Sequence, residues 1–317
     1  MKGDDIMLTT PMDVLHRFPV RKSKAQKQAF REAVQAYVES LGYTCTVESG
    51  SYGVRNLVIG DPKTAKYLLT AHYDTCARLL WPNMVTPCNA LVFWAYQILQ
   101  VLLLMLAASS VTAVVCWIAG TGDIASPVAL TVYWSLLILM MIGPANRHNA
   151  NDNTSGVVTV LEIARTLPEN QRNKVCFVLF DLEEAGLLGS AAYRKAHKKE
   201  TDAQVVLNLD CVGDGDHILL MPTKKLRKNV EKLGPIYKAC GYFGNKSILV
   251  KEKGYCFYPS DQKNFPYGVG IGAFHIKKGI GHYYSRIHTP KDTVLDQTNV
   301  NILRAAITSM ICSDAAQ

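Results

Sequence analysis

Charged residues are scarce in this 317-residue sequence, at 19% of the total, against about 25% in ordinary globular domains. The shortage is local, because residues 79–146 contain no Lys or Arg and Asp123 is their only acid. All 34 basic residues therefore lie elsewhere, with 25 of the 26 acidic ones. A basic remainder beside an apolar segment favours contact with an anionic membrane surface. No tract of Lys and Arg interleaved with aromatic residues occurs, which argues against a nucleic-acid partner.

The nine cysteines also lack a pattern. They are odd in number and show no CxxC or other regular spacing, so a disulfide framework and a zinc ribbon are disfavoured. The first 30 residues lack the apolar core of a cleavable signal peptide. We therefore expect reduced thiols and a protein body in the cytoplasm.

The charge-poor segment is long enough to cross a membrane twice. A membrane span needs about 20 apolar residues, and two such runs flank the break at Thr121-Gly122-Asp123. We predict a transmembrane helical hairpin inserted over residues 79–147, with spans of about 90–118 and 124–143. The basic residues all lie on the side of the chain ends, so the positive-inside rule predicts a two-span protein of the cell membrane whose body faces the cytoplasm. The alternative is a buried apolar hairpin inside a large soluble core.

Outside this hairpin, short apolar strands alternate with helices. The expected strands cover residues 44–48, 56–59, 67–70, 175–180, 205–209 and 271–276. The expected helices cover residues 22–41, 157–167, 187–197, 225–240 and 300–312. Alternation of this kind predicts an α/β fold, with a mainly parallel mixed sheet and helices on both faces as a three-layer sandwich. Residues 1–78 and 148–317 would together form this discontinuous catalytic domain.

Side chains of metal-ligand type lie at or near the ends of several predicted strands. They are His72, Asp152, Glu183, Glu184, Asp210 and His288. The carboxyl ends of parallel strands meet at one edge of a sheet, so these side chains are expected to converge. One such residue alone is more often structural than catalytic. Together they supply enough oxygen and nitrogen ligands for two metal ions, with one carboxylate left over as a base.

Five short motifs carry a family resemblance. They are His72-Tyr73-Asp74, Asn151-Asp152-Asn153, Glu183-Glu184-Ala185-Gly186, Asn208-Leu209-Asp210 and His288-Thr289-Pro290. In this order they resemble the motifs of the co-catalytic zinc peptidases, which include bacterial leucyl aminopeptidases, glutamate carboxypeptidases and glutaminyl cyclases. The resemblance extends over Leu69–Thr293 apart from the insertion. It implies a zinc-peptidase fold and the hydrolysis of peptide bonds by a metal-bridging water.

The resemblance also implies a ligand set for two Zn²⁺ ions. Asp152 would bridge the ions, one held by His72 and Asp210 and the other by Glu184 and His288. Mixed imidazole and carboxylate ligation suits zinc, and the many oxygen ligands also leave Co²⁺ or Mn²⁺ open.

Further roles follow from the same resemblance. Glu183 would be the general base, and Asp74 would fix the orientation of the neighbouring histidine. The Asp152-Asn153 peptide matches a place where the family holds a cis bond. The tyrosine that polarises the scissile carbonyl in the family does not align cleanly, and Tyr255 and Tyr258 both stay open as substrate-binding candidates.

These observations predict a membrane-anchored zinc metallopeptidase, of aminopeptidase type and acting on short peptides. Its partners would be a peptide substrate and the lipid bilayer. A glutaminyl-peptide cyclotransferase, which works with one zinc, is one alternative. A carboxypeptidase is another, because Lys277, Lys278 and Arg286 could hold a substrate carboxylate. The third alternative is a catalytically inactive membrane scaffold.

Overall fold

The computed structural model describes residues 7–314, and its centre is a ten-stranded sheet. The strand order is β1-β2-β4-β3-β5-β9-β6-β8-β7, with β10 paired to β9. The strands are β1 (Cys45–Ser49), β2 (Arg55–Ile59), β3 (Tyr67–His72), β4 (Val175–Phe180), β5 (Val205–Leu209), β6 (His217–Pro222), β7 (Gly241–Phe243), β8 (Lys246–Val250), β9 (Gly268–Lys277) and β10 (Gly281–Tyr283).

The parallel part of the sheet lies at its centre. Strands β4, β3, β5 and β9 pair in parallel, and β6 pairs with β8 in parallel further out. The other pairs, β1 with β2, β2 with β4, β6 with β9, β7 with β8 and β10 with β9, are antiparallel. The predicted α/β fold with a mixed sheet is confirmed, and the difference is that parallel pairing dominates only the centre. Every residue of β3, β4 and β5 is buried, which explains their continuous apolar sequences.

Helices cover both faces of the sheet. They are α1 (Asp13–Arg17), α2 (Lys24–Ser40), α5 (Gly156–Thr166), α6 (Leu188–Ala196), α7 (Lys198–Thr201), α8 (Lys224–Arg227), α9 (Val230–Tyr237) and α10 (Gln297–Ser313). Leu69 of β3 belongs to the core shared with α2, α5 and α10, whereas its neighbour Leu68 packs in the second core with Tyr193 of α6. This alternation is what a two-residue strand period requires. The single helix expected over residues 225–240 is divided, because Asn229 caps a new helix by accepting from the N–H of Lys232.

A buried ion pair fastens α2 to the catalytic edge of the sheet. Lys27 Nζ lies 2.7 Å from Oδ1 of Asp181, the residue that follows β4, and both side chains are almost fully buried. Helix α2 begins with a capping box, in which Ser23 accepts from the N–H of Gln26 while the Gln26 side chain accepts from the N–H of Ser23. The first residue after β4 is thereby tied to the first turn of α2.

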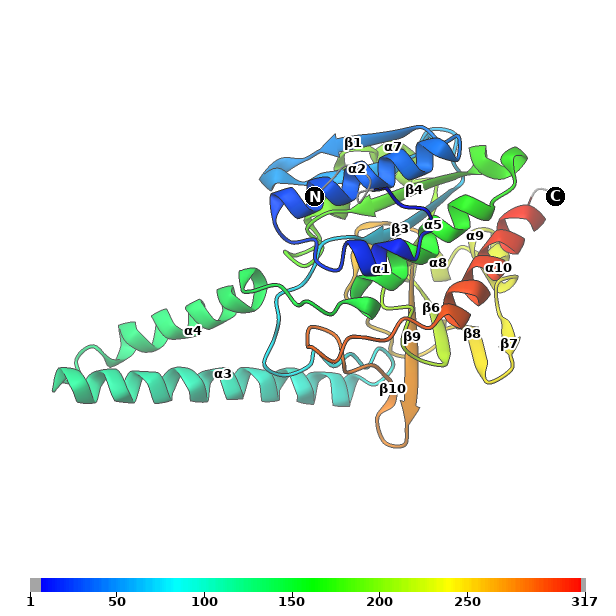
Figure 1. Cartoon of the computed structure of the whole chain (residues 1–317). Coiled ribbons are helices and arrows are strands. Elements are labelled where there is room, and N and C mark those ends of the chain that lie inside the picture. Colours follow the sequence, from blue (N-terminus) through cyan, green and yellow to red (C-terminus); the bar gives the residue numbers. More distant parts are fainter. Residues whose placement is uncertain (1–6, 315–317) are drawn as a thin grey trace.

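Two apolar helices, α3 (Ala90–Ala119) and α4 (Ala125–Ile142), project from the body side by side (Figure 1). Their mean hydropathies of 2.4 and 1.9 make both apolar enough to cross a membrane, and at 1.5 Å per residue they are about 45 and 27 Å long. Their bounds lie close to the spans expected from the sequence. Asn89 caps α3 by accepting from the N–H of Val92.

Candidate active site

Three predicted site segments meet at the carboxyl edge of the parallel strands. His72 is the last residue of β3, Asp210 directly follows β5, and Glu183-Glu184 lies in the turn after β4. Since β4, β3 and β5 are neighbours running the same way, their ends bring these side chains together. The other two predicted ligands, Asp152 and His288, come from a helical turn (Ala150–Ser155) and from the loop after β10.

The carboxylate of Asp152 lies between two imidazoles, those of His72 and His288. Its Oδ1 is 3.2 Å from Nε2 of His72, and its Oδ2 is 3.1 Å from Nε2 of His288. Asp210 Oδ1 lies 3.6 Å from the same atom of His72, and Glu184 Oε2 lies 3.5 Å from that of His288. Each imidazole nitrogen therefore faces two carboxylates, one of which is shared.

Several ligand atoms of this cluster have no hydrogen-bond partner within the described chain. They include Oε1 of Glu184 and Oδ1 of Asp210, both buried. Three groups bring their ligand atoms within 4.8 Å of one another: His72 with Glu183 and Asp210, Cys76 with Asp152, Glu184 and His288, and Asp152 with Asp210 and Cys211. Buried acceptors without partners are costly, and a cation would satisfy them. The donors are therefore of the kind that binds metal cations; Cys76 and Cys211 are neighbours that the motifs did not indicate.

Burial and mutual repulsion dominate the electrostatics of the cluster. Burial raises the pKa of Glu183 well above its usual range, and the adjacent Glu184 adds to this effect. Burial, with Asp152, also raises the pKa of Glu184 to about 8. For His288, burial alone would lower the pKa, but Glu184 and Asp152 raise it to about 9. A metal cation at the cluster would oppose these shifts, because it favours ionised carboxylates and neutral imidazoles.

Asp74 positions the backbone of Glu183 and Glu184. Its two carboxylate oxygens accept the backbone N–H groups of Glu183, at 3.0 Å, and Glu184, at 3.2 Å. Its Oδ1 also lies 3.5 Å from Nδ1 of His72, an ion-pair distance without hydrogen-bond geometry. One buried carboxylate thus contacts two segments of the site.

The turn that carries Asp152 is bonded to the segment after β5. The Asn153 side chain donates to the carbonyl of Leu209 over 2.9 Å, and Asn151 Oδ1 accepts from the N–H of Gly213 over 2.7 Å. The Asp152-Asn153 peptide is cis, as expected. These bonds fix the separation of the two aspartates at the end of the sheet.

Left-handed backbone occurs within the site itself. His288 has φ 61°, and Leu182 and Cys211, next to Glu183 and Asp210, have φ 56° and 55°. Such conformations are uncommon outside glycine and concentrate at functional sites.

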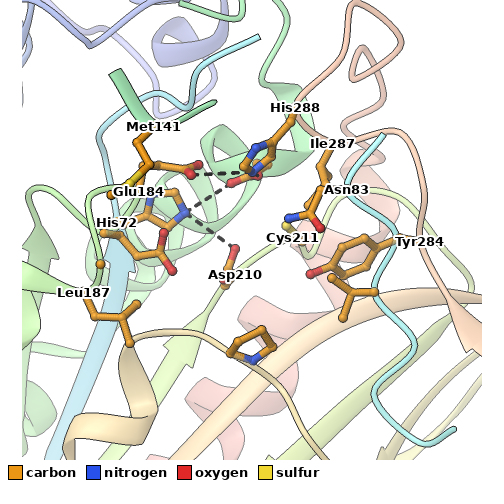
Figure 2. Close-up of a pocket in the computed structure, with 15 residues that line it drawn as sticks. His72, Asn83, Met141, Glu184, Leu187, Asp210, Cys211, Tyr284, Ile287 and His288 are labelled. Carbon is orange, nitrogen blue, oxygen red and sulfur yellow. Dashed lines mark ion pairs between the residues drawn. The ribbon is translucent and has the colours of Figure 1, made fainter. Parts of the chain in front are cut away.

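A cavity of about 350 Å³ opens beside the cluster. Its walls include side chains that sequence reasoning missed, namely Asn83, Val85, Met141, Leu187, Tyr284 and Ile287. Met141, in the last turn of α4, stands beside Glu184, with Tyr284 on the far side (Figure 2). An apolar wall facing a carboxylate cluster suits a substrate with a charged group and an apolar side chain.

The two tyrosine candidates occupy different environments. Tyr258 is buried and donates its hydroxyl to the carbonyl of Asp210 over 2.8 Å. Tyr255 is 38% exposed and is not among the described residues that line the cavity. Tyr284, which does line it, directs its hydroxyl to that of Tyr258 over 3.4 Å. Tyr284 also forms an antiparallel bridge with Val85. The two residues lie far apart in the sequence, so hydrophobic periodicity does not predict this pairing.

We predict that Gly156→Ala disrupts the site. An added Cβ would lie 2.3 Å from Asn153 Oδ1 and 2.3 Å from the carbonyl oxygen of Leu209, so the turn that carries Asp152 must shift. Overpacking of this kind costs about 1–3 kcal/mol. Thermal unfolding and metal content of the purified protein measure the effect.

The matched control is Gly234→Ala, in α9, where an added Cβ meets nothing within 4 Å. This variant should be as stable as the wild type or more so, because Ala favours helix over Gly by about 1 kcal/mol. If Gly156→Ala were as stable as Gly234→Ala and bound as much metal, the tight packing inferred at Gly156 would be contradicted.

The chain is similar to proteins of known activity over parts of its length. It is 43% identical to the aminopeptidase YwaD of Bacillus subtilis over 67 residues, 20% of this chain and 15% of that protein. It is 32% identical to leucine aminopeptidase 1 of Paracoccidioides brasiliensis over 163 residues, 46% of this chain and 40% of that protein. The chain spans less than half the length of these relatives.

Structural similarity covers far more of the chain. The LapA aminopeptidase of Legionella pneumophila superposes with a TM-score of 0.58 at 13% sequence identity, over 99% of this chain and 73% of that one. At this identity the likeness concerns the fold alone. The family model of Peptidase family M28 matches residues 56–310, and this range contains all five motifs. The resemblance seen in the motifs is thereby confirmed, and the chain belongs to peptidase family M28.

Proposed function

We propose that this protein is a membrane-anchored zinc aminopeptidase that acts on short peptides. The observation that carries the proposal is the cluster around Asp152, where two imidazoles and their carboxylate partners line a cavity. Membership of family M28 and the aminopeptidases among the relatives support it.

Two zinc ions fit the donors best. His72 and Asp210 would hold one ion, Glu184 and His288 the other, and Asp152 would give one oxygen to each, since its two oxygens face different imidazoles. When bound, the zinc ions would supply Lewis acidity toward a peptide carbonyl and toward water.

The proton transfers fall to Glu183. It lines the cavity, is buried, and belongs to the same ligand-distance group as His72 and Asp210. Its carboxylate would take a proton from the attacking water and deliver it to the leaving amine. Asp74 would act as a positioning residue, because it bonds the backbone of the glutamate pair.

The charges at the cavity favour an aminopeptidase over the alternatives. Among the described lining residues there is no Lys or Arg, so a substrate carboxylate finds no basic side chain to bind. Arg286 pairs with Asp214 at 3.1 Å, and Lys277 and Lys278 lie exposed at the β9–β10 turn. With one zinc only, as in a glutaminyl cyclase, Asp152 and one pair of these donors would suffice, and the other pair would have no role. The full set of donors likewise disfavours an inactive scaffold.

Helices α3 and α4 support the membrane placement. Their apolar windows are only 17% and 0% buried, so the body does not cover them as a soluble core would. The chain leaves the body through α3 and returns to it through α4. The connection between the two helices carries one charge, that of Asp123. The basic body would then face the cytoplasm.

Residues at the base of this hairpin line the proposed substrate cavity. Val85 precedes α3 and Met141 lies in the last turn of α4, and both line the cavity with Leu187 and Ile287. An apolar wall of this kind would bind a large apolar N-terminal side chain. The cavity would also open close to the bilayer surface, where apolar peptides concentrate.

We predict that Glu183→Gln lowers kcat by about 10²–10⁴-fold, the usual contribution of a general base. Bound zinc should remain close to the wild-type level, because Gln removes the proton acceptor and leaves the proposed ligands in place. Peptide hydrolysis and elemental analysis of the detergent-purified protein measure both. Glu39→Gln, an exposed glutamate of α2, is the control and should change neither. An unaltered kcat would remove Glu183 from this role.

We predict that Met141→Ala reduces kcat/KM for peptides with N-terminal Leu by about tenfold, the scale of a lost apolar contact. Peptides with N-terminal Ala should lose far less, because their side chain does not reach the wall. Leu139→Ala, on the same helix and 55% exposed, should leave both substrates unaffected. An equal loss for the two peptides in Met141→Ala would count against a specificity role.

We predict that an N-terminal tag resists protease added to intact cells and is digested after permeabilisation. A cleavage site inserted into residues 120–124 should be cut from outside in the same cells. The opposite result for both sites would reverse the orientation derived from the positive-inside rule.

A further inference from the structure

A second cavity, of about 400 Å³, lies at the start of α2 and shares no lining residue with the catalytic cavity. Its charged lining residues are Lys22, Lys24, Lys27, Arg31, Arg55 and Asp181. Its volume falls within the range of about 300–1,000 Å³ usual for small-ligand sites.

Positive charge in this cavity is uncompensated. Asp181 is the only carboxylate among its described lining residues, and Lys27 occupies it at 2.7 Å. Within residues 7–314, none of the other four cations forms an ion pair. Arg31 donates to the hydroxyl of Tyr73, and Arg55 to the carbonyl of Val54. Like charges held together repel one another, and a ligand with several anionic oxygens would relieve this repulsion.

The cavity adjoins the end of α4. Lys22 Nζ donates to the carbonyl of Met141, in the last turn of α4, over 3.3 Å. A neighbouring hollow is lined by Lys22 and Leu182 from the basic cavity and by Met141 and Ile142 from the helix. Figure 1 shows the start of α2 close to the point where α4 meets the body. The cations therefore lie where a membrane-spanning α4 would leave the hydrocarbon layer, at the depth of lipid headgroups.

We propose that this cavity binds the phosphate of an anionic phospholipid. Basic pockets beside membrane helices on the cytoplasmic side are suited to anionic headgroups. The two guanidinium groups, of Arg31 and Arg55, can hold phosphate oxygens, and the exposed Ile142 side chain would lie against the acyl chains. A zwitterionic lipid carries its own positive charge, so the basic cavity would bind it far more weakly. The proposal rests on the membrane anchoring proposed above and is independent of peptidase activity.

The test compares lipid retention in detergent micelles. Native mass spectrometry would measure binding of phosphatidylglycerol and phosphatidylcholine to the wild type and to Lys24→Gln/Arg55→Gln. Both substituted residues are exposed, so the fold should tolerate the change. The control is Lys195→Gln/Lys199→Gln, also exposed and outside both cavities.

The wild type and the control should prefer phosphatidylglycerol at least tenfold. Lys24→Gln/Arg55→Gln should weaken its binding about 30-fold, since each basic side chain at an anionic surface contributes about fivefold. Equal retention of the two lipids by the wild type would overturn the proposal, as would unchanged binding in the double variant. Displacement of the lipid by millimolar inorganic phosphate would reassign the cavity to a soluble anion.

Two further measurements separate this proposal from the proposed function. Extraction of the wild type by alkaline carbonate would contradict the membrane anchoring, and the lipid assignment with it. Lack of peptide hydrolysis in a protein that still prefers phosphatidylglycerol would contradict the catalysis and uphold the lipid site.

Discussion

The structure is organised around an electrostatic conflict at the carboxyl edge of its sheet. Asp152, Glu183, Glu184 and Asp210 are brought together away from bulk water, with only two imidazoles among them. Repulsion between buried carboxylates costs free energy, so the surrounding backbone must hold these side chains in place. The bonds from Asp74, Asn151 and Asn153 serve this purpose, because each fastens one loop of the site to another. The fold thus maintains an arrangement that its own charges oppose.

The apolar insertion takes part in that restraint. The chain segments just before and just after the hairpin are joined by the antiparallel bridge between Ala77 and Ala145. The segment that leads into the hairpin then runs beside the loop that carries His288. Leu79 donates its N–H to the carbonyl of His288, and Val85 bridges to Tyr284. A segment whose composition indicates only a membrane anchor therefore braces the last site histidine. Removing it would affect the cavity as well as the location of the protein.

The sequence predicted those parts of the site that depend on strand ends. His72 and Asp210 follow continuous apolar strands, and parallel neighbours must bring such ends together. Met141 and Tyr284 were missed, because their place at the cavity results from pairing between distant segments and leaves no periodic signal. Strands β6, β7, β8 and β10 were missed as well, and two of them, β7 and β10, have only three residues each. Charge and apolar runs, in contrast, gave both helices of the hairpin nearly to the residue.

Met141 connects the two cavities, and this has a mechanical consequence. Its side chain lines the catalytic cavity, while its backbone carbonyl accepts from Lys22 at the basic cavity. A lipid phosphate that draws Lys22 toward itself would act on the same turn of α4 that forms a wall of the substrate cavity. After that turn the chain runs through Gly143-Pro144 to the bridge at Ala145, so a short link joins the helix end to the body. Lipid composition and substrate selectivity would then be coupled through one residue, without any contact between lipid and peptide.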